Sequence, residues 1–320
     1  MSRCADHRDT DRMRAAGVRV LGGPVELLEL ADPPGPGDGE VLIDVFAAGI
    51  GNWEDLVRTG DWDVGIRPPM ALGVEAAGTV RAIGATVSRF AVGDAVMVHS
   101  APLRYQGAWA ERFLASEAEV AAKPPSLDWP VAGVLPVPLL TAVQVVGNLA
   151  CQPTDVVLVH GAGGLTGGLH VLMAAQTGCR IVATASPSSA DRVRAYGAAG
   201  VVDYRAPDWQ SQLKAHSPGG FTLAINTVPG AAPSLLPFVA DAGRLTTITG
   251  DAPPSERGIE VKYVIVAADG LALEAAAELV ARVGPRVTVA ETAGLNEAAG
   301  ALQRVVEGSG GGARVVDPRR

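Results

Sequence analysis

The stretch 156–170 constrains the fold more than any other part of this 320-residue chain. It opens with an apolar run, continues through a glycine-dense turn, and is followed over 165–177 by apolar side chains at helical spacing. Gly161, Gly164 and Gly167 fall three residues apart. Glycines at such a turn let the backbone approach a phosphate, and the helix that follows offers free N–H groups and the positive end of its dipole. The pattern predicts a dinucleotide site; a flexible loop without a ligand is the alternative.

Composition argues against several other classes of protein. The 26 Lys and Arg residues are outnumbered by 34 Asp and Glu, which argues against a nucleic-acid-binding surface. Cys4, Cys151 and Cys179 form no CxxC or Cys/His cluster, which is typical of reduced thiols without a zinc site. The first 14 residues lack the apolar core of a signal peptide, and no apolar run approaches the roughly 18–20 residues of a membrane span. We therefore expect a cytoplasmic protein that binds neither nucleic acid nor membrane.

The pattern of elements changes partway along the chain. Residues 1–14 suggest a disordered arm. Over 15–127, short strands between glycine and proline turns predict a small barrel-like β domain, with the clearest strand at 40–47. Over 128–266, strand and helix patterns alternate, which predicts a parallel sheet covered by helices. The strands and helices of 267–320 then close the chain.

Five motifs, in the same order, resemble those of the medium-chain dehydrogenase/reductase superfamily. LGVEAAGTV at 72–80 is similar to the family's GHExxGxV segment, VGDAV at 92–96 to its VGDxV turn, and GAWAE at 107–111 to its GGxAE corner. HGAGGLTG at 160–167 is similar to the HGAxGGVG loop of the quinone oxidoreductase and enoyl reductase branch. GAAGVVDY at 197–204 is similar to the GAxxVIDY of that branch. Each motif is short, but five in order make a specific resemblance.

The resemblance runs over about 14–316 and implies an α/β protein of two domains. A GroES-like, β-barrel-type catalytic domain would comprise 15–127 and 267–320. A Rossmann domain, a doubly wound parallel sheet that binds the nucleotide, would comprise 128–266. In relatives the strand corresponding to 259–266 pairs across a two-fold axis, so the resemblance also implies a homodimer.

Departures from the family pattern decide the subclass. The zinc alcohol dehydrogenases of this superfamily hold zinc with a Cys in the loop after the EVL strand and with the His of GHE. Here that loop carries Gly49, Gly51 and Asn52, Val74 replaces the His, and Glu75 alone remains as a possible ligand. Zinc requires three protein ligands and an open position, so we expect a zinc-independent protein. For Glu75, the favoured interpretation is a buried carboxylate paired with an arginine.

The end of the second Rossmann strand indicates the cofactor. NAD-preferring sites place an acid there to bind the ribose hydroxyls, whereas this strand ends in VATASP at 182–187 without one. Ser186 would not repel a 2′-phosphate, so we expect NADPH rather than NADH. Relatives often carry a Lys near Ser189; Arg192 either substitutes for it or is a solvated surface residue. The residues expected to bind NADPH are Gly161, Gly163, Gly164, Leu165, Thr166, Gly167, Ser186, Arg192, Tyr204, Asn226, Thr227, Thr249 and Gly250.

Without a metal, the hydride acceptor has to delocalise negative charge onto a carbonyl oxygen. A quinone or the C=C bond of an α,β-unsaturated carbonyl compound does so; its oxygen needs hydrogen-bond donors and its α-carbon a proton. The candidate catalytic residues are Asn52, in the loop that holds zinc in relatives, Tyr105, and Thr141, which resembles a family position near the nicotinamide. Some enoyl reductases use a Tyr in the helix after this loop, but 55–59 has none, so Tyr105 or water is expected to deliver the proton. A turn-forming Asn52 and an exposed loop Tyr105 are the alternatives.

Two other functions remain open at this point. A cyclase or isomerase on the same scaffold would bind NADPH without consuming it. A non-enzymatic protein would bind NADPH as a sensor or a structural element.

Overall fold

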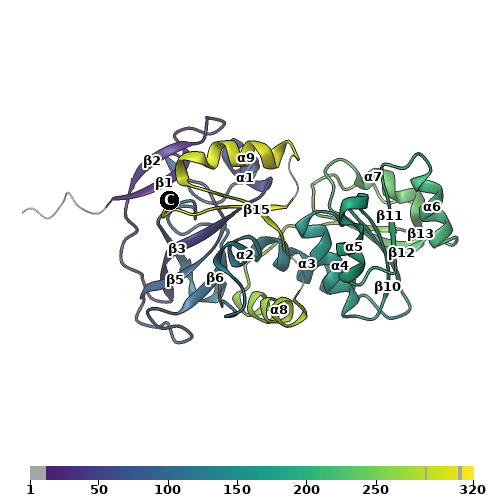
Figure 1. Cartoon of the computed structure of the whole chain (residues 1–320), viewed down its shortest axis with the longest axis horizontal. Coiled ribbons are helices and arrows are strands. Elements are labelled where there is room, and N and C mark those ends of the chain that lie inside the picture. Colours follow the sequence, from purple (N-terminus) through teal and green to yellow (C-terminus); the bar gives the residue numbers. More distant parts are fainter. Residues whose placement is uncertain (1–11, 285–286, 309–311) are drawn as a thin grey trace, which may run out of the picture. The chain divides into compact units, whose positions relative to one another are not determined.

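The computed structural model describes residues 12–284, 287–308 and 312–320. The chain divides into two compact units (Figure 1). The first comprises residues 1–137, 268–278 and 288–320, and the second comprises residues 138–267 and 279–287. Throughout the described ranges, no helix combines the length and the apolar character needed to cross a membrane.

The first unit is built around two β-sheets. A three-stranded sheet has the order β2 (Glu26–Ala31), β1 (Arg12–Val18), β4 (Met70–Ala71). A seven-stranded sheet has the order β15-β16-β3-β5-β6-β8, and β7 also pairs with β3. The bounds of its strands are β3 (Glu40–Ile50), β5 (Glu75–Ile83), β6 (Ala95–His99), β7 (Arg112–Ser116), β8 (Val120–Ala122), β15 (Val289–Ala293) and β16 (Ala313–Val316). Because β16 pairs with β3, the end of the chain completes the sheet that its beginning starts.

The helices of the first unit are short: α1 (Trp53–Thr59), η1 (Glu117–Glu119), α2 (Trp129–Val134), η3 (Leu295–Glu297) and α9 (Ala298–Val306). Two longer helices contain the boundaries between the units: α3 (Pro136–Leu149) belongs to the second unit from residue 138 onward, and α8 (Gly270–Val283) belongs to the first unit up to residue 278. Trp109 and Phe113 are fully buried in the core, and the indole N–H of Trp109 donates to the carbonyl oxygen of Gly49 at 2.9 Å. This bond fixes the end of β3, where the loop with the predicted Asn52 begins.

The prediction of a disordered arm over residues 1–14 is wrong for residues 12–14. Residues 12–14 begin β1, and Met13 pairs with Leu30 of β2. The Met13 side chain is 1% exposed and packs in a cluster with Leu28 and Leu30. Burial of this side chain stabilises the strand. The sequence did not indicate this strand, because the N-terminus is mainly polar and charged. Residues 1–11 lie outside the described residues.

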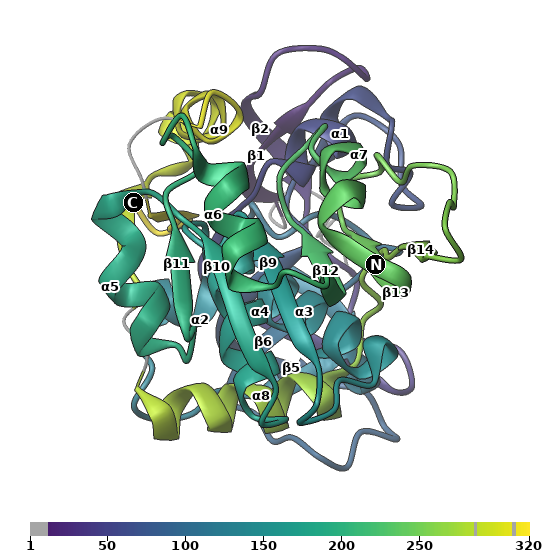
Figure 2. The same ribbon diagram turned by 90° about the vertical axis from the view of Figure 1, so that its right-hand side faces the viewer.

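The second unit contains a six-stranded sheet in which every described pairing is parallel. Its order is β11-β10-β9-β12-β13-β14 (Figure 2). The chain starts at β9, moves outward through β10 and β11, and then returns to the other side of β9 with β12. This reversal defines the switch point of a doubly wound sheet, where ligands bind beyond the carboxyl ends of the strands. The strands are β9 (Val156–His160), β10 (Arg180–Thr184), β11 (Gly200–Val202), β12 (Phe221–Asn226), β13 (Val239–Thr247) and β14 (Glu260–Tyr263), connected by α4 (Leu165–Ala175), α5 (Pro187–Ala195), α6 (Trp209–His216), α7 (Ala232–Leu235) and η2 (Leu236–Phe238).

The predicted fold class is confirmed: a β-rich unit accompanies a parallel α/β sheet. The core of the second unit includes Leu158, Val182, Ala224 and Leu245, one from each of four neighbouring strands, and each is completely buried. Such strands, buried on both faces, carry continuous apolar runs, which is why the sequence identified them.

Candidate functional site

The glycine loop lies between β9 and α4, at the switch point of the sheet. Thr184, the last residue of β10, holds it on two sides: its hydroxyl oxygen accepts from the N–H of Gly161 at 3.0 Å, and its carbonyl oxygen accepts from the N–H of Ala162 at 3.0 Å. The Thr184 hydroxyl is also 2.8 Å from Nδ1 of His160. Burial lowers the pKa of His160, so its ring is neutral near pH 7 and serves the loop as a hydrogen-bonding group. Sequence reasoning did not single out Thr184, because its role depends on the neighbouring strand.

Two glycines of the loop are required by the packing of the protein itself. Gly161 has a φ of +89°, a region that favours glycine, and a Cβ there would lie 2.5 Å from Oγ1 of Thr227. A Cβ on Gly167 would lie 2.3 Å from the carbonyl oxygen of Gly161. Both positions exclude a side chain whether or not a ligand is bound.

The other two glycines of the loop are not required by packing. Gly164 has a φ of −78°, and a Cβ there would meet nothing closer than the Gly161 carbonyl oxygen at 3.6 Å. A Cβ on Gly163 would meet Ser189 at 3.4 Å, an ordinary contact. The packing of the protein therefore tolerates a Cβ at Gly163 and at Gly164. Glycine is what a pyrophosphate that approaches the backbone closely requires there.

The N-terminus of α4 faces the same part of the loop. Gly164 is its N-cap, makes no side-chain capping bond, and no acidic residue lies in the first turn. The first N–H groups of a helix have no partner within it, and the helix dipole adds positive potential there. The residues Leu165 and Thr166 thus begin a helix whose end suits an anion.

The predicted phosphate-binding residues beyond β10 are partly brought together. Ser186 is the N-cap of α5, and its hydroxyl lies 3.0 Å from that of Ser188. Nη2 of Arg192 donates to the carbonyl oxygen of Gly163 at 2.7 Å and to Oγ of Ser189 at 3.3 Å. Arg192 is therefore attached to the glycine loop, which does not fit its interpretation as a solvated surface residue.

Tyr204 and Thr227 have other neighbours. Tyr204, beyond β11, is 44% exposed, and the guanidinium of Arg205 lies 5.5 Å from the centre of its ring. Thr227 donates its hydroxyl hydrogen to the carbonyl oxygen of His160 at 2.8 Å. This bond ties the end of β12 to the end of β9.

The carboxyl ends of β12 and β13 hold a polar network that includes two predicted residues. Asn226 is completely buried, and its Nδ2 lies 3.0 Å from Oγ1 of Thr247 and 3.1 Å from Oγ1 of Thr249. Both threonine hydroxyls donate to Oδ1 of Asp251, at 2.6 and 2.7 Å. Gly250, between Thr249 and Asp251, has a φ of +74°, so the turn itself requires this glycine.

Asp251 was missed by the sequence reasoning, although an acid directly after a strand-end Thr-Gly pair was a usable signal. Its Oδ2 accepts from the N–H of Ala232, at the start of α7, at 2.9 Å. Burial raises the pKa of Asp251, but the hydrogen bonds from Thr247, Ala232 and Thr249 outweigh it, and the pKa lies below its usual value. Asp251 is thus an anion that organises this end of the sheet.

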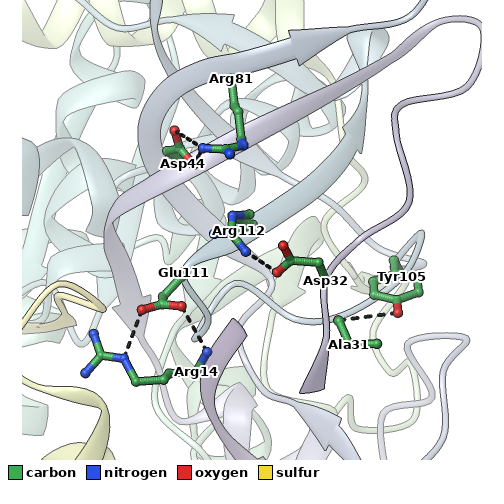
Figure 3. A network of polar contacts seen from close by, with 8 residues as sticks. All are labelled: Arg14, Ala31, Asp32, Asp44, Arg81, Tyr105, Glu111 and Arg112. Atoms are coloured by element: carbon green, nitrogen blue, oxygen red, sulfur yellow. Dashed lines mark hydrogen bonds and ion pairs between the residues drawn. The ribbon is translucent and has the colours of Figure 1, made fainter. Parts of the chain in front are cut away.

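The candidate catalytic residues are distributed over both units. Asn52, in the first unit, is the exposed N-cap of α1 and makes no capping bond with its side chain. Tyr105, also in the first unit, is half-buried and donates weakly to the carbonyl oxygen of Ala31 at 3.4 Å (Figure 3). Thr141 belongs to the second unit, where it is 5% exposed on α3. Among the residues that the structure describes, no hydrogen bond joins Asn52 to Tyr105 within the first unit.

Ion pairs hold the strands around Tyr105. Arg14 donates to Glu111 at 2.9 Å, and Arg112 pairs with Asp32, the residue after Ala31 (Figure 3). These side chains are partly exposed, so each pair contributes little stability by itself. Together they fix the strand ends to which the Tyr105 hydroxyl is bonded.

The predicted pairing of Glu75 with an arginine is wrong. Oε2 of Glu75 accepts from the backbone N–H of Val137 at 2.7 Å. A Cβ on Gly49 would lie 2.1 Å from Oε1 of Glu75, so this glycine makes room for the carboxyl group. The nearby charged group is a second carboxyl, that of Glu54, which raises the pKa of Glu75 in addition to the larger effect of burial.

Glu54 was not identified from the sequence because an acid in the first turn of a helix is common. It is completely buried, and its two carboxyl oxygens accept from the N–H groups of Gly73 at 3.0 Å and Val74 at 3.2 Å. Burial raises the pKa of Glu54 to about 7 despite these two bonds. The pair Glu54 and Glu75 therefore retains a proton near neutral pH. In the part of the chain that the structure describes, no cluster of three or more His, Cys, Asp or Glu side chains is arranged to hold a metal ion.

Comparisons with known proteins agree with this architecture. Residues 37–125 match the family described as the alcohol dehydrogenase GroES-like domain, and residues 196–316 match the family described as zinc-binding dehydrogenase. Over 211 residues the chain is 35% identical to the synaptic vesicle membrane protein VAT-1 homolog of Rattus norvegicus, covering 63% of this chain and 49% of the relative. Over 207 residues it is 32% identical to the quinone oxidoreductase of Homo sapiens, covering 63% of this chain and 62% of the relative. The alignments thus span about half to under two thirds of these relatives.

A solved structure extends the comparison to nearly the whole chain. The crystal structure of an NAD-dependent alcohol dehydrogenase matches with a TM-score of 0.84 and 26% identity, covering 95% of this chain and 99% of that one. A GroES-like segment followed by a doubly wound sheet, with oxidoreductases among its relatives, shows that this chain belongs to the medium-chain dehydrogenase/reductase superfamily.

Proposed function

We propose that this chain is a zinc-independent, NADPH-dependent reductase that transfers hydride to a quinone or to the C=C bond of an α,β-unsaturated carbonyl compound. One observation carries the nucleotide part of this proposal. Packing accounts for Gly161 and Gly167, but a Cβ at Gly163 or Gly164, at the N-terminus of α4, would make only ordinary van der Waals contacts. Glycine at two positions where the protein has room for a side chain is what a closely approaching pyrophosphate requires.

The preference for NADPH over NADH rests on the surroundings of Ser186. No carboxylate lies at the end of β10 or in the first turn of α5, and Arg192 is fixed to the loop by its bond to Gly163. A 2′-phosphate would meet a cation and hydroxyl groups there, and charge-assisted bonds of this kind are strong. The similarity to an NAD-dependent alcohol dehydrogenase is the reason to measure both cofactors.

The residues proposed to hold NADPH are those of the glycine loop, with Ser186 and Arg192 at the phosphate, Tyr204 nearby, and Asn226, Thr227, Thr249 and Gly250 at the strand ends. Bound NADPH would supply the hydride. Asn52, Tyr105 and Thr141 are proposed to bind and orient the acceptor's carbonyl oxygen. Tyr105 or water would deliver the proton; the 3.4 Å bond from Tyr105 to Ala31 is long, so releasing this hydroxyl costs little.

The quinone or enone class of acceptor is supported by the human quinone oxidoreductase among the relatives. It is also supported by the chemistry of the chain, because Val74 and the glycine-rich loop around Asn52 offer no second or third zinc ligand. An acceptor that carries its own electron sink then needs only hydrogen-bond donors. We propose the cytoplasm as the place of action.

We also propose a homodimer formed through β14. This strand lies at the edge of the six-stranded sheet, and Tyr263 and Ile265 at and just beyond it are 48% and 60% exposed. An edge strand with exposed apolar side chains pairs readily with a second copy. Sedimentation analysis tests this: a species of twice the chain mass is expected, and a Tyr263→Pro variant should sediment as a monomer.

The reaction is tested by mixing the protein with NADPH or NADH and a panel of quinones and enones. Loss of reduced-nicotinamide absorbance with at least one acceptor, and with NADPH preferred, is the expected result. Tight binding of NADPH without oxidation by any acceptor would refute the reductase proposal. Product formation without loss of NADPH would indicate a redox-neutral cyclisation or isomerisation instead.

A further inference from the structure

A pocket with a volume of about 150 Å³ lies at the C-terminal end of α1, in the first unit. Val57 of α1, Val64 of the loop that follows and Met70 of β4 line this pocket. They are 2%, 2% and 1% exposed, so they form its inner wall. Trp62 and Ile66 also line it and are half-buried, so they lie nearer its mouth. The pocket is therefore an apolar recess within a single unit of the chain.

Hydrogen bonds of the protein itself hold the walls of the pocket in place. The N–H of Gly22, in the turn between β1 and β2, donates to the carbonyl oxygen of Arg58 at 2.8 Å. In return, Nη1 of Arg58 donates to the carbonyl oxygens of Gly22 and Gly23, each at 2.9 Å. The N–H of Leu103 donates to the carbonyl oxygen of Val64 at 2.8 Å, which fixes the loop after α1. A ligand therefore enters a pocket whose shape is already set, and it does not have to order the walls.

The charged groups that line the pocket compensate each other. Nη1 and Nη2 of Arg67 donate to Oδ1 and Oδ2 of Asp63 at 2.7 and 2.8 Å. These bonds hold the pKa of the Asp63 carboxyl well below its usual value, so the pair remains ionised at neutral pH with a net charge of zero. The other lining residues are uncharged. A charged ligand would lose hydration in the pocket without meeting a free counter-ion, whereas a neutral ligand avoids this cost.

The volume and Trp62 together indicate the shape of the ligand. An apolar cavity of about 150 Å³ accommodates a benzene ring. The Trp62 ring at the pocket offers offset-stacked or edge-to-face contacts, which aromatic rings gain in addition to the burial of apolar surface. We propose that this pocket is a binding site for a neutral compound with a single aromatic ring.

The site goes beyond the proposed reductase function. Asn52 is the N-cap of α1, whereas Gly60, which lines the pocket, is its C-cap. The 7 residues between them form a helix about 10 Å long. The pocket thus lies at the other end of α1 from Asn52, and its occupancy can be measured without NADPH or a hydride acceptor.

The test is a titration of the full-length chain with fluorobenzene, in the absence of nucleotide, followed by ¹⁹F NMR. We expect a saturable change in the fluorine signal. We also expect a thermal midpoint that rises with fluorobenzene concentration, because this ligand binds the folded chain. In competition, benzoate and benzylammonium, which add a charge to the ring, should bind at least tenfold more weakly than toluene. A signal that changes linearly without saturation, or charged rings that compete as well as toluene, would overturn the proposal.

Adjacent residues of α1 provide a matched pair of variants. Val57→Phe places a ring inside the pocket and should weaken fluorobenzene binding at least tenfold. Leu56→Phe should leave binding unchanged, because Leu56 is 47% exposed and does not line the pocket. Ile66→Trp fills the pocket from its half-buried mouth and should also weaken binding, which keeps the test valid if Val57→Phe does not fold. Circular dichroism verifies the fold of each variant. If a folded filling variant binds fluorobenzene as tightly as the unchanged chain, the ring binds elsewhere and the proposal is wrong.

Discussion

Gly164→Asp should raise the stability of the second unit and, at the same time, abolish nucleotide binding. Asp is among the best N-cap residues, and the N-cap of α4 at present has no side-chain bond. The backbone at Gly164, with φ −78° and ψ 166°, suits any L-residue, and the new Cβ meets nothing within 3.5 Å. We therefore expect a gain of a few tenths to about 1 kcal/mol in the free energy of unfolding from the cap and the helix dipole.

The effect on binding has the opposite sign and is larger. A carboxylate about 4 Å from a phosphate repels it by about 4 kcal/mol at an effective dielectric constant of about 20. That corresponds to a dissociation constant for NADPH about a thousandfold higher. Changes of opposite sign distinguish a residue reserved for a ligand from one required by the fold.

Gly167→Ala provides the matched control. Its Cβ would lie 2.3 Å from the carbonyl oxygen of Gly161, so the backbone has to shift. We expect a loss of about 1–3 kcal/mol of stability, with weaker binding as a consequence of the distorted loop.

Thermal unfolding and NADPH titration, by calorimetry or by nucleotide fluorescence, measure both quantities on the same samples. The expected result for Gly164→Asp is a higher unfolding midpoint with binding lost. If Gly164→Asp binds NADPH as tightly as the unchanged chain, the pyrophosphate does not lie over this loop. If Gly164→Asp unfolds at a lower temperature, the N-cap position of α4 is not free to accept a capping side chain.

Three further results follow from the structure. Arg192→Gln should reduce the preference for NADPH over NADH by about tenfold or more, because it removes a charge-assisted bond to the 2′-phosphate. Arg194→Gln, which removes an exposed ion pair with Asp191, should leave this preference unchanged. The ratio of the kcat/KM values for the two cofactors measures the preference. The pKa of Glu54 is 4.5 in an unfolded chain and about 7 when folded, so its contribution to stability is fully present below pH 4.5 and is lost as the pH rises to 7. In the Glu54→Gln variant, the free energy of unfolding should lack this pH-dependent loss of about 3 kcal/mol. If denaturant unfolding gives the same pH profile for the variant and the unchanged chain, burial does not raise the pKa of Glu54. Tyr105→Phe should lower kcat/KM at least tenfold while changing the free energy of unfolding by under about 1 kcal/mol. Unchanged turnover would show that the Tyr105 hydroxyl takes no part in the reaction and only bonds to Ala31.

The sequence alone determined the features that depend on residues close to one another along the chain. The apolar run, the glycine spacing and the helical period at 156–177 are local, so they identified β9, the loop and α4. The alternating pattern beyond residue 128 predicted a parallel sheet for the same reason. Residue identity also made a zinc centre unexpected, because Val74 has no metal-binding atom.

The tertiary structure decided which glycines of the loop the packing requires and which it does not, since that depends on Thr227, which follows another strand, and on the carbonyl of Gly161. It also decided the partners of buried polar groups. Glu75 was expected beside an arginine, but the charged group that affects its pKa is the carboxyl group of Glu54, in the first turn of α1. Burial and the pKa of a side chain arise from the groups that folding places around it, and no local pattern in the chain specifies those groups.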